Sequence, residues 1–352
     1  MAKAEPNAAP IRIGGQEIRA GQRLRVDVPL PSLFTQTTVF LPVHVLHGRR
    51  PGPRLFVTAA VHGDEINGIA IIRRLLASTQ LKNLRGTLLA VPVVNVYGFV
   101  RHSRYLPDRR DLNRSFPGSG SGSLASRLAA ALMTDVVADS DIGIDLHTGA
   151  AHRENLPQIR ADLNDPVLVR LADAFGAPVT LHSASPEGSL RGAAAAVGVP
   201  VMVYEAGEAL RFDEASIRIG VHGVVNVLRR LGMVPAAKTR APKPAAVLRS
   251  STWVRADQSG IVRTLVKLGG AVGKGDTLAL IADPFGEKED SVLAPAAGVI
   301  IGRVTLPLVY EGEALFHIGK TRLAESVGEQ FEAAQADLEN PAPELIEEPP
   351  IV

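Results

Sequence analysis

The sequence predicts an α/β fold with a mostly parallel or mixed sheet flanked by helices, followed by a smaller all-β barrel-sandwich domain. Apolar strand-like runs alternate with helix-like segments from residue 54 to residue 231. A proline-rich stretch interrupts this pattern at 235–244, and short apolar runs separated by glycines follow it. The chain of 352 residues is roughly two to three times as long as a common domain, which favours two domains.

Elements of the first domain can be placed from their apolar periodicity. The strongest is the run 54–61, whose apolar residues are nearly continuous, as in a strand buried on both faces of a sheet. Directly after it, Ile69, Ile72 and Leu75 recur at helical spacing, which predicts a helix over 66–76. Further strands are predicted at 86–94, 141–146 and 200–204, and further helices at 124–137, 167–175, 190–197 and 217–231. Because strands and helices alternate, the sheet is expected to be mostly parallel.

The predicted organisation divides the chain into five segments. Prolines lack an amide donor, so the proline-rich stretch after residue 235 is expected to be a linker. The glycine-separated apolar runs that follow indicate short strands with tight turns. The segments are a flexible N-terminal segment at 1–25, a catalytic domain at 26–235, a linker at 236–248, a β domain at 249–320 and an acidic tail at 321–352.

The charge is distributed unevenly along the chain. The formal net charge of +2 is too small to argue for a nucleic-acid or membrane partner, so neither is expected. The last 32 residues hold eight acidic side chains and one arginine, a local charge of −7, which leaves +9 for the rest. This positive field is compatible with a small anionic substrate, but solvated surface arginines are the favoured explanation of the charge alone. Within the tail, 324–338 has the pattern of an amphipathic helix, with Val327 and Phe331 on its apolar face.

Cysteine is absent, which excludes disulfides, thiolate nucleophiles and thiolate metal sites together. Any metal must therefore be held by histidine and carboxylate side chains. The N-terminus lacks the apolar core of a signal peptide, and no apolar stretch is long enough to span a bilayer. We therefore expect a cytoplasmic protein. The sequence leaves open whether the protein is a monomer or a homo-oligomer.

Four chemically active side chains stand at the ends of predicted strands. His62 and Glu65 follow the run 54–61, His147 closes the strand at 141–146, and Glu205 ends the strand at 200–204. In open α/β sheets, ligands bind beyond the carboxyl ends of the strands, so these side chains are expected to meet at one edge. A histidine and a glutamate three residues apart are common by chance. Three strand ends that each carry a metal-binding or basic group are not expected by chance. A combination of imidazole and carboxylate ligands suits Zn²⁺.

An arginine-rich loop supplies a second group of candidate residues. The stretch 104–118 contains Arg104, Asn113 and Arg114 close to the predicted strand ends. Guanidinium groups offer forked donors that match carboxylates, and an adjacent asparagine adds amide donors and a carbonyl acceptor. The loop is therefore interpreted as an anion-recognition segment.

Four motifs in this order resemble the succinylglutamate desuccinylase/aspartoacylase family, a branch of the zinc carboxypeptidase-like hydrolases. They are His-Gly-Asp-Glu at 62–65, Arg-Asp-Leu-Asn-Arg-Ser-Phe-Pro-Gly at 110–118, Asp-Leu-His-Thr-Gly at 145–149 and Glu-Ala-Gly at 205–207. The resemblance covers about residues 35–320. It implies one zinc ion per chain with His62, Glu65 and His147 as ligands, and Glu205 as the general base.

The same resemblance implies how a substrate is bound. Asn113 and Arg114 are expected to grip its carboxylate, and Arg104 is expected near the scissile carbonyl, with Arg101 as the alternative. In aspartoacylases a tyrosine of the C-terminal domain also reaches the site. The segment 309–316 is similar to that region, which makes Tyr310 the candidate, against the alternative of a tyrosine that packs locally in the barrel.

The β domain has a resemblance of its own. Its motifs at 259–262, 272–276 and 294–299 look like those of biotinyl/lipoyl-type barrel-sandwich modules. Lys288 lies near the hairpin where such carriers bear a prosthetic group, but Glu287 and Glu289 do not match the Met-Lys-Met context of biotinylation. We therefore expect a structural or dimer-forming module.

The resemblance implies a zinc-dependent amide hydrolase that deacylates a small, anionic N-acyl amino acid. Two alternatives stay open. One is a metallocarboxypeptidase that trims peptide C-termini with a similar ligand set, and the other is a non-catalytic binding or carrier protein built on the β domain. The acyl group cannot be read from local motifs, although Arg191 and Arg211 are possible pocket residues.

Overall fold

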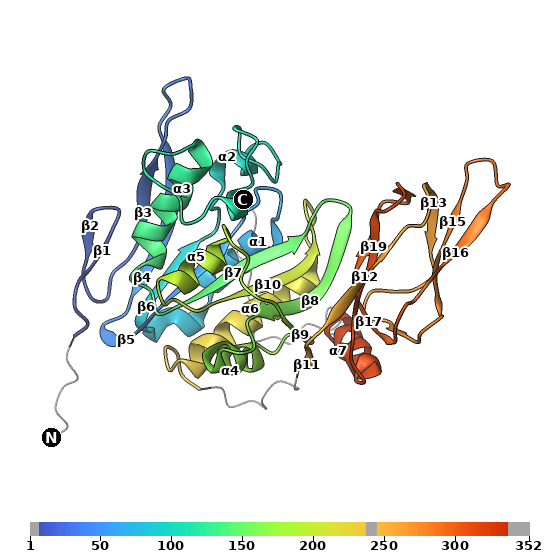
Figure 1. The fold of residues 1–352 in the computed structure, drawn as a ribbon. Coiled ribbons are helices and arrows are strands. Elements are labelled where there is room, and N and C mark those ends of the chain that lie inside the picture. Colours follow the sequence, from blue (N-terminus) through green and yellow to red (C-terminus); the bar gives the residue numbers. More distant parts are fainter. Residues whose placement is uncertain (1–6, 237–244, 337–352) are drawn as a thin grey trace.

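The computed structural model describes residues 7–236 and 245–336. In this part of the chain, a mixed sheet of thirteen strands runs through the whole molecule, and helices cover both faces of its N-terminal two thirds (Figure 1). A four-stranded sheet packs beside the C-terminal end of the large sheet. The predicted α/β class, with a mixed sheet and a C-terminal β-rich region, is confirmed. No helix of the described residues has both the length and the apolar character that crossing a membrane requires.

Four parallel strands form the centre of the large sheet. They lie in the order β6 (Arg85–Val91), β5 (Arg50–Ala59), β7 (Ile142–Gly149) and β10 (Val201–Glu208). Their apolar runs are buried on both faces, as the near-continuous hydrophobic pattern predicts. Close packing also requires a glycine in β7, because a Cβ atom at Gly143 would lie 2.1 Å from the ring of Phe56 on β5.

Antiparallel strands extend this centre on both sides. On one side lie β4 (Val39–His47) and β3 (Arg23–Leu30). On the other side β8 (Arg153–Ala161) runs antiparallel to β10, and its outer edge has two partners. The first half of β8 pairs with β17 (Gly298–Val304), and the second half pairs with β9 (Val179–His182), which in turn pairs with β11 (Ala246–Leu248).

Helices fill the two faces of the sheet and give it two apolar cores. One face carries α1 (Asn67–Ala77), α4 (Pro166–Phe175) and α6 (Glu214–Arg230). The other carries α3 (Leu124–Leu132), the π-helical turn η3 (Met133–Val137) and α5 (Leu190–Ala196). Three short helical segments lie in the connections of this region: α2 (Val96–Phe99), η1 (Thr79–Asn83) and η2 (Leu112–Arg114).

Capping side chains mark the starts of α4, α5 and α6. Asp165 accepts a hydrogen bond from the amide of Val167 and is followed by a proline at the first helical position of α4. Asp213 caps α6 in the same way, so α6 begins at Glu214, three residues before the predicted helix. Ser189 caps α5, the helix that packs on β10.

The C-terminal region consists of short strands around a core of its own. That core includes Val254, Leu278, Ile300 and Phe316. The strands are β12 (Ser251–Arg255), β13 (Gly260–Thr264), β14 (Ala271–Val272), β15 (Thr277–Ala282), β16 (Glu289–Leu293), β18 (Leu308–Val309) and β19 (Ala314–Gly319), besides β17. Of these, β12, β14, β17 and β19 belong to the large sheet, and the other four form the small sheet.

Three segments differ from the sequence expectation. The segment 1–25, expected to be flexible, contains β1 (Ile11–Ile13) and β2 (Gln16–Ile18), which form a hairpin that buries Ile13 and Ile18. The strand β8 was not expected at all. The strand β11 lies within the expected linker, whose residues 237–244 are outside the described residues.

The acidic tail begins with the helix α7 (Ala324–Ala336), whose Val327 and Phe331 are buried as the pattern predicts. Leu338 and the rest of the tail lie outside the described residues. The domain boundaries themselves stay a prediction.

Candidate metal centre and active-site cavity

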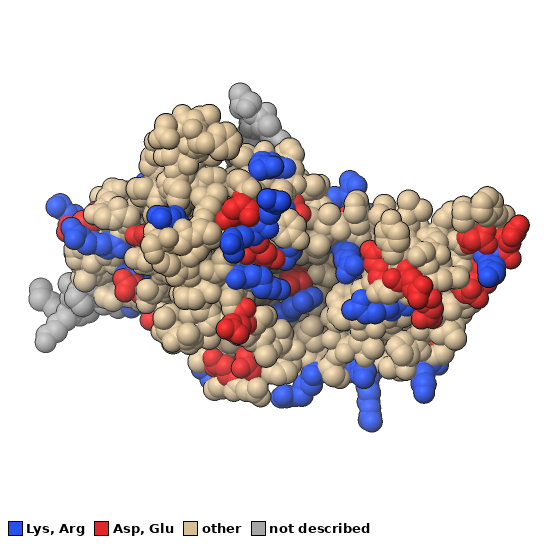
Figure 2. Space-filling view, turned by 45° about the horizontal axis from the view of Figure 1, so that its top comes forward, with Lys and Arg blue, Asp and Glu red and all other residues tan. Residues whose placement is uncertain are grey.

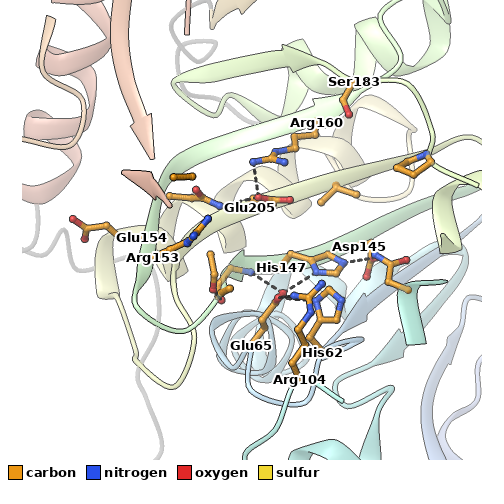
Figure 3. A pocket seen from close by; sticks show the side chains of 18 of the residues that line it. His62, Glu65, Arg104, Asp145, His147, Arg153, Glu154, Arg160, Ser183 and Glu205 are labelled. Atoms are coloured by element: carbon orange, nitrogen blue, oxygen red, sulfur yellow. Dashed lines mark hydrogen bonds and ion pairs between the residues drawn. The ribbon is translucent and has the colours of Figure 1, made fainter. Parts of the chain in front are cut away.

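Three side chains from separate elements converge in one buried cluster. His62 follows β5, Glu65 lies in the turn before α1, and His147 lies near the end of β7. One ligand atom from each lies within 4.8 Å of the others, and all three residues are buried. Figure 3 shows the side chains pointing toward one another, with Arg104 beside them. The edge of the sheet where they meet is the one that the sequence predicts.

The backbone around His62 makes this convergence possible. Ala60, directly after β5, has a φ of +50°, which turns the chain sharply out of the sheet. Gly63 packs against the backbone of α2, where a Cβ atom would lie 2.2 Å from the carbonyl carbon of Gly98. A side chain at position 63 would therefore push the loop that carries His62 and Glu65 away from the sheet.

The donor set fits a zinc ion. The Nδ1 atom of His62 lies 2.6 Å from Oε1 of Glu65, and the Nδ1 atom of His147 lies 2.7 Å from Oε2 of the same carboxylate. Two imidazole nitrogens and a carboxylate are thus presented to one point, and this combination of nitrogen and oxygen donors is typical of zinc sites that keep a fourth position open for water.

Two further carboxylates lie behind the histidines. The Nε2 atom of His147 is 2.7 Å from Asp145, and the Nε2 atom of His62 is 3.2 Å from Asp111. A metal-binding histidine commonly donates its second ring N–H to such a carboxylate, which fixes the tautomer and the ring orientation. This second pair of contacts is the observation that distinguishes the cluster from a chance group of polar residues.

The proximity of these groups shifts their pKa values in the metal-free chain. Burial alone would raise the pKa of Glu65, but the two imidazoles and their hydrogen bonds hold it well below its usual range. Burial would lower the pKa of His147, but Asp145 and Glu65 raise it well above its usual value. The pKa of His62 is raised by Glu65 and Asp111 against the same effect of burial.

Glu205 lies beside this cluster because of strand register. It is the partner of His147 in the parallel pairing of β10 with β7, so the two side chains point to the same face of the sheet. Its Oε2 atom accepts a hydrogen bond of 2.8 Å from Asn155 and forms an ion pair of 2.9 Å with Arg160. Both partners lie on β8, so β8 orients the carboxylate that the sequence suggests as general base.

Arg104 is the arginine of its loop that reaches the cluster. Its guanidinium donates to Glu65 at 3.3 Å and to Asp111 at 2.9 Å. Arg101 is exposed and is not among the described residues that line the cavity. Of the two candidates left open by the sequence, Arg104 therefore has the geometry to face a reacting group.

Asn113 and Arg114 line the same cavity, together with Arg191. The Oδ1 atom of Asn113 accepts a hydrogen bond of 2.9 Å from the amide of Leu190 at the start of α5, which brings η2 next to Arg191. Arg191 is buried, and its guanidinium donates to the carbonyl oxygens of Ser183 and Ala184 at 3.0 Å each. Arg211, in contrast, is exposed and does not line the cavity.

These residues line a cavity of about 310 Å³. Its lining from the strands and helices before residue 236 is mostly polar, whereas the C-terminal strands contribute Trp253, Arg303, Val304, Ala314 and Leu315. Figure 2, in which the top of Figure 1 is turned forward, shows acidic and basic side chains gathered in the middle of this face. The volume suits a small molecule and not a folded partner.

The structure does not bring Tyr310 to the cavity. Its side chain is 80% exposed and lies just after β18, which pairs with β13 in the small sheet and not with the strands beside the cavity. The C-terminal aromatic side chain that lines the cavity is instead Trp253 on β12. Lys288 is exposed in the turn between β15 and β16, where its amide donates to Asp283.

Sequence reasoning missed several residues that the structure places in the site. For Asp145 a signal was present, since residues two apart on a strand face the same side and His147 follows it at that spacing. Asn155 and Arg160 were missed with the whole of β8. Trp253 and Arg303 carry no local signal, because the pairing of β17 with β8 brings them to the cavity.

Comparison with known proteins places the chain in a family. The sequence model of the succinylglutamate desuccinylase/aspartoacylase catalytic domain matches residues 51–231, about half of the chain. The chain belongs to this family. It is 28% identical over 256 residues to N-alpha-acetyl-L-2,4-diaminobutyric acid deacetylase of Halomonas elongata, covering 70% of this chain and 75% of that protein.

Solved structures show the same relationship. The product-bound ectoine utilization protein EutE (DoeB) from Ruegeria pomeroyi has a TM-score of 0.79 and 26% identity, covering 91% of this chain and all of that chain. A succinylglutamate desuccinylase/aspartoacylase from Rhodobacter sphaeroides has a TM-score of 0.78 and 25% identity, covering 90% of this chain and 99% of that chain. The fold of these relatives therefore extends over the C-terminal strands as well as the matched catalytic region.

Proposed function

We propose that this protein is a zinc-dependent amidohydrolase that removes the acyl group from a small, anionic N-acyl amino acid. One zinc ion per chain would be held by His62, Glu65 and His147. The observation that supports the proposal most strongly is the convergence of these three ligand atoms in the same cavity as Glu205. The relative from Halomonas elongata, which is named for removing an acetyl group from an amino acid, supports the same reaction type.

Glu205 is the proposed general base of the reaction. His62, Glu65 and His147 would hold a zinc ion, which would supply Lewis-acid activation when bound. Glu205 takes the proton of the attacking water and delivers it to the leaving amine. Asn155 and Arg160 keep its carboxylate turned toward the cavity during both transfers.

Arg104 is the proposed donor to the oxygen that becomes negatively charged when water attacks the carbonyl. Its guanidinium is already fixed by Asp111 and Glu65, so little reorganisation is needed when charge develops. One preorganised donor of this kind contributes about 2.7–4 kcal/mol to the stabilisation of the transition state. At the other end of the substrate, Asn113, Arg114 and Arg191 would hold the carboxylate of the amino acid.

Activity on peptides is disfavoured by the C-terminal strands. Trp253, Val304 and Leu315 line the cavity on the side that a longer peptide would need to cross and narrow the space there. A metallocarboxypeptidase would need that side open. Short peptides therefore belong in the activity panel, and their hydrolysis in preference to N-acyl amino acids would favour the carboxypeptidase alternative.

The proposal is tested with the zinc-loaded protein and a panel of N-acyl amino acids, with release of the free amine as the readout. Glu205→Gln is expected to lower kcat by about 10²- to 10⁴-fold, the usual contribution of general acid–base catalysis, while it retains one zinc per chain. Glu208→Gln, on the same strand but outside the cavity lining, is the matched control and is expected to keep its activity. Undiminished turnover by Glu205→Gln would refute the assignment of the base.

The binding or carrier alternative predicts a different result. A carrier would hydrolyse none of the panel, and the intact chain would have the mass of a form modified at Lys288. An unmodified mass together with hydrolysis by the zinc-loaded protein supports the hydrolase.

A further inference from the structure

The two ends of the cavity differ in their charge balance. At the end formed by η2 and α5, the cations are Arg114 and Arg191. The contacts of Arg191 are to Ser183 and Ala184, which are neutral, and Arg114 donates to the backbone oxygen of Asn113. The positive charge at this end is therefore available to a carboxylate of the substrate.

At the opposite end, cations and anions are paired. Figure 3 shows Arg153 and Glu154 on the far side of Glu205 from Asp145. Glu154 forms an ion pair with Arg303 on β17, and Arg153 forms one of 3.7 Å with Glu313. Two arginines face two glutamates here, so the net charge of the four side chains is zero.

The C-terminal strands add an apolar part to the lining of this end. Trp253, Val304, Ala314 and Leu315 all come from the C-terminal strands, and all lie outside the region that the family model matches. They line the part of the cavity that would hold the acyl group, on the far side of the scissile bond from Arg114 and Arg191.

Trp253 is held in a fixed orientation. Its indole stacks on the imidazole of His317 with ring centroids 4.1 Å apart and 7° between the planes. The Nε2 atom of His317 lies 2.7 Å from Ser251 Oγ, and burial together with the nearby Arg160 lowers the pKa of His317 to about 3. The imidazole in this stack is therefore neutral in the physiological pH range. Moving the indole aside to admit a larger group would break the stacking contact.

We propose that the acyl group of the substrate is short and uncharged, in the class of acetyl, and that Trp253 with the Arg303–Glu154 and Arg153–Glu313 pairs excludes dicarboxylic acyl groups such as succinyl. This inference rests on the proposed function. The indole of Trp253 is 43% exposed, so the distal carboxylate of a succinyl group would lose only part of its hydration beside it and two aliphatic side chains. No free cation compensates this loss among the described residues of this end, because both arginines there are paired with glutamates. A short aliphatic acyl group meets no such cost.

Binding tests this inference without relying on turnover. Calorimetry would use zinc-loaded Glu205→Gln protein and matched N-acetyl and N-succinyl derivatives of glutamate, lysine and 2,4-diaminobutyrate. We expect the N-acetyl compound of at least one amino acid to bind at least 100-fold more tightly than its N-succinyl partner. Comparable affinity for the two compounds, tighter binding of the succinyl compound, or binding of neither would overturn the inference.

Two variants of the same protein test the cause of the selectivity. Glu154→Gln releases Arg303 from its carboxylate, so the ratio of succinyl to acetyl affinity is expected to rise at least tenfold. Trp253→Ala enlarges the apolar end, so an N-butyryl compound is expected to gain at least tenfold relative to N-acetyl. Glu311→Gln, an exposed substitution outside the cavity lining, is the control and should change neither ratio. Ratios unaffected by both cavity variants would contradict the assigned role of these residues.

The outcomes separate this inference from the proposed function. Hydrolysis of N-succinyl and N-acetyl compounds at equal kcat/KM would refute the inference and leave the amidohydrolase intact. If the protein binds N-acetyl compounds selectively but hydrolyses none of them, the proposed amidohydrolase activity is refuted and the proposed acyl selectivity is supported.

Discussion

Each histidine of the candidate metal centre has a carboxylate on both sides. Glu65 contacts the Nδ1 atom of each ring, and Asp145 and Asp111 contact the opposite nitrogens. Asp145 is itself held by Thr58, whose hydroxyl donates to it at 2.7 Å from β5. The ring of His147 is therefore oriented by the sheet, and the ring of His62 is oriented by Asp111 from the loop before η2.

This arrangement makes the metal affinity sensitive to Asp145. Asp145→Asn keeps the shape of the side chain but removes the charge behind His147, so we expect zinc to bind about 10- to 100-fold more weakly. Competition with a chromophoric chelator measures the change. Asp173→Asn, an exposed residue of α4, serves as the control with unchanged affinity. If Asp145→Asn bound zinc as tightly as the parent protein, the carboxylate would have no role in holding the ligand.

At the scale of elements, β8 determines which parts of the chain meet at the site. One edge pairs with β10, and the other pairs first with β17 and then with β9. Pro157 lies between these two pairings, where the strand also has an irregular register with β10, so its missing amide removes no hydrogen bond of the ladder. The middle of the same strand shares an apolar cluster with α7, in which Leu156 packs with Val327 and Phe331.

The contact between α7 and β8 predicts a difference between two phenylalanines. Phe331 is 5% exposed and Phe285 is 85% exposed. Phe331→Ala creates a cavity in the core, so we expect it to lower the free energy of unfolding by about 3–5 kcal/mol. The same change at Phe285, in the turn after β15, should stay within about 0.5 kcal/mol. Urea unfolding of both variants measures the difference, and equal midpoints would show that α7 does not stabilise the fold.

The sequence alone predicts the centre of the fold better than its periphery. The strands β5, β7 and β10 have continuous apolar runs because they are buried on both faces. Near their ends lie His62, His147 and Glu205, of which Glu205 is the register partner of His147. In contrast, β8 has polar residues on the side that faces the cavity and a proline in its middle, so its pattern does not resemble a buried strand.

The position of Tyr310 could not be predicted for a related reason. The segment that carries it resembles that of aspartoacylases, but which side of the C-terminal region faces the cavity depends on the pairing of β17 with β8. Such a long-range register leaves no mark in the local sequence. The same register explains why Trp253, a residue without a motif, is the one that lines the cavity.

At the scale of the whole molecule, protons and metal compete for the same buried cluster. In the metal-free protein, the pKa values of His62 and His147 are raised above the ordinary value of 6.5. Their contribution to stability is therefore complete below pH 6.5 and is lost as the pH rises through the raised values. The lowered pKa of Glu65 has the opposite sign, because its contribution is present above its ordinary pKa of 4.5 and is lost in acid.

This competition predicts how zinc stabilises the protein at different pH values. Zinc binds deprotonated imidazoles, so it replaces the protons that the metal-free cluster loses above pH 6.5. The difference in Tm between zinc-loaded and chelator-treated protein should therefore be larger at pH 8 than at pH 6. In His147→Gln the difference should be small at both values. This linkage is contradicted if the difference in Tm of the parent protein does not change with pH or becomes smaller toward pH 8.

The continuous ladder from β10 through β8 to β17 also limits how the protein exchanges small molecules with its surroundings. Because Asn155 and Glu154 are register partners of Gly302 and Arg303, the C-terminal strands cannot swing away as a rigid flap without breaking main-chain hydrogen bonds. Opening of the cavity by movement of these strands would therefore require the pairing of β17 with β8 to break. Replacing the C-terminal strands with those of a relative would change the acyl selectivity only if the new β17 keeps the same register with β8.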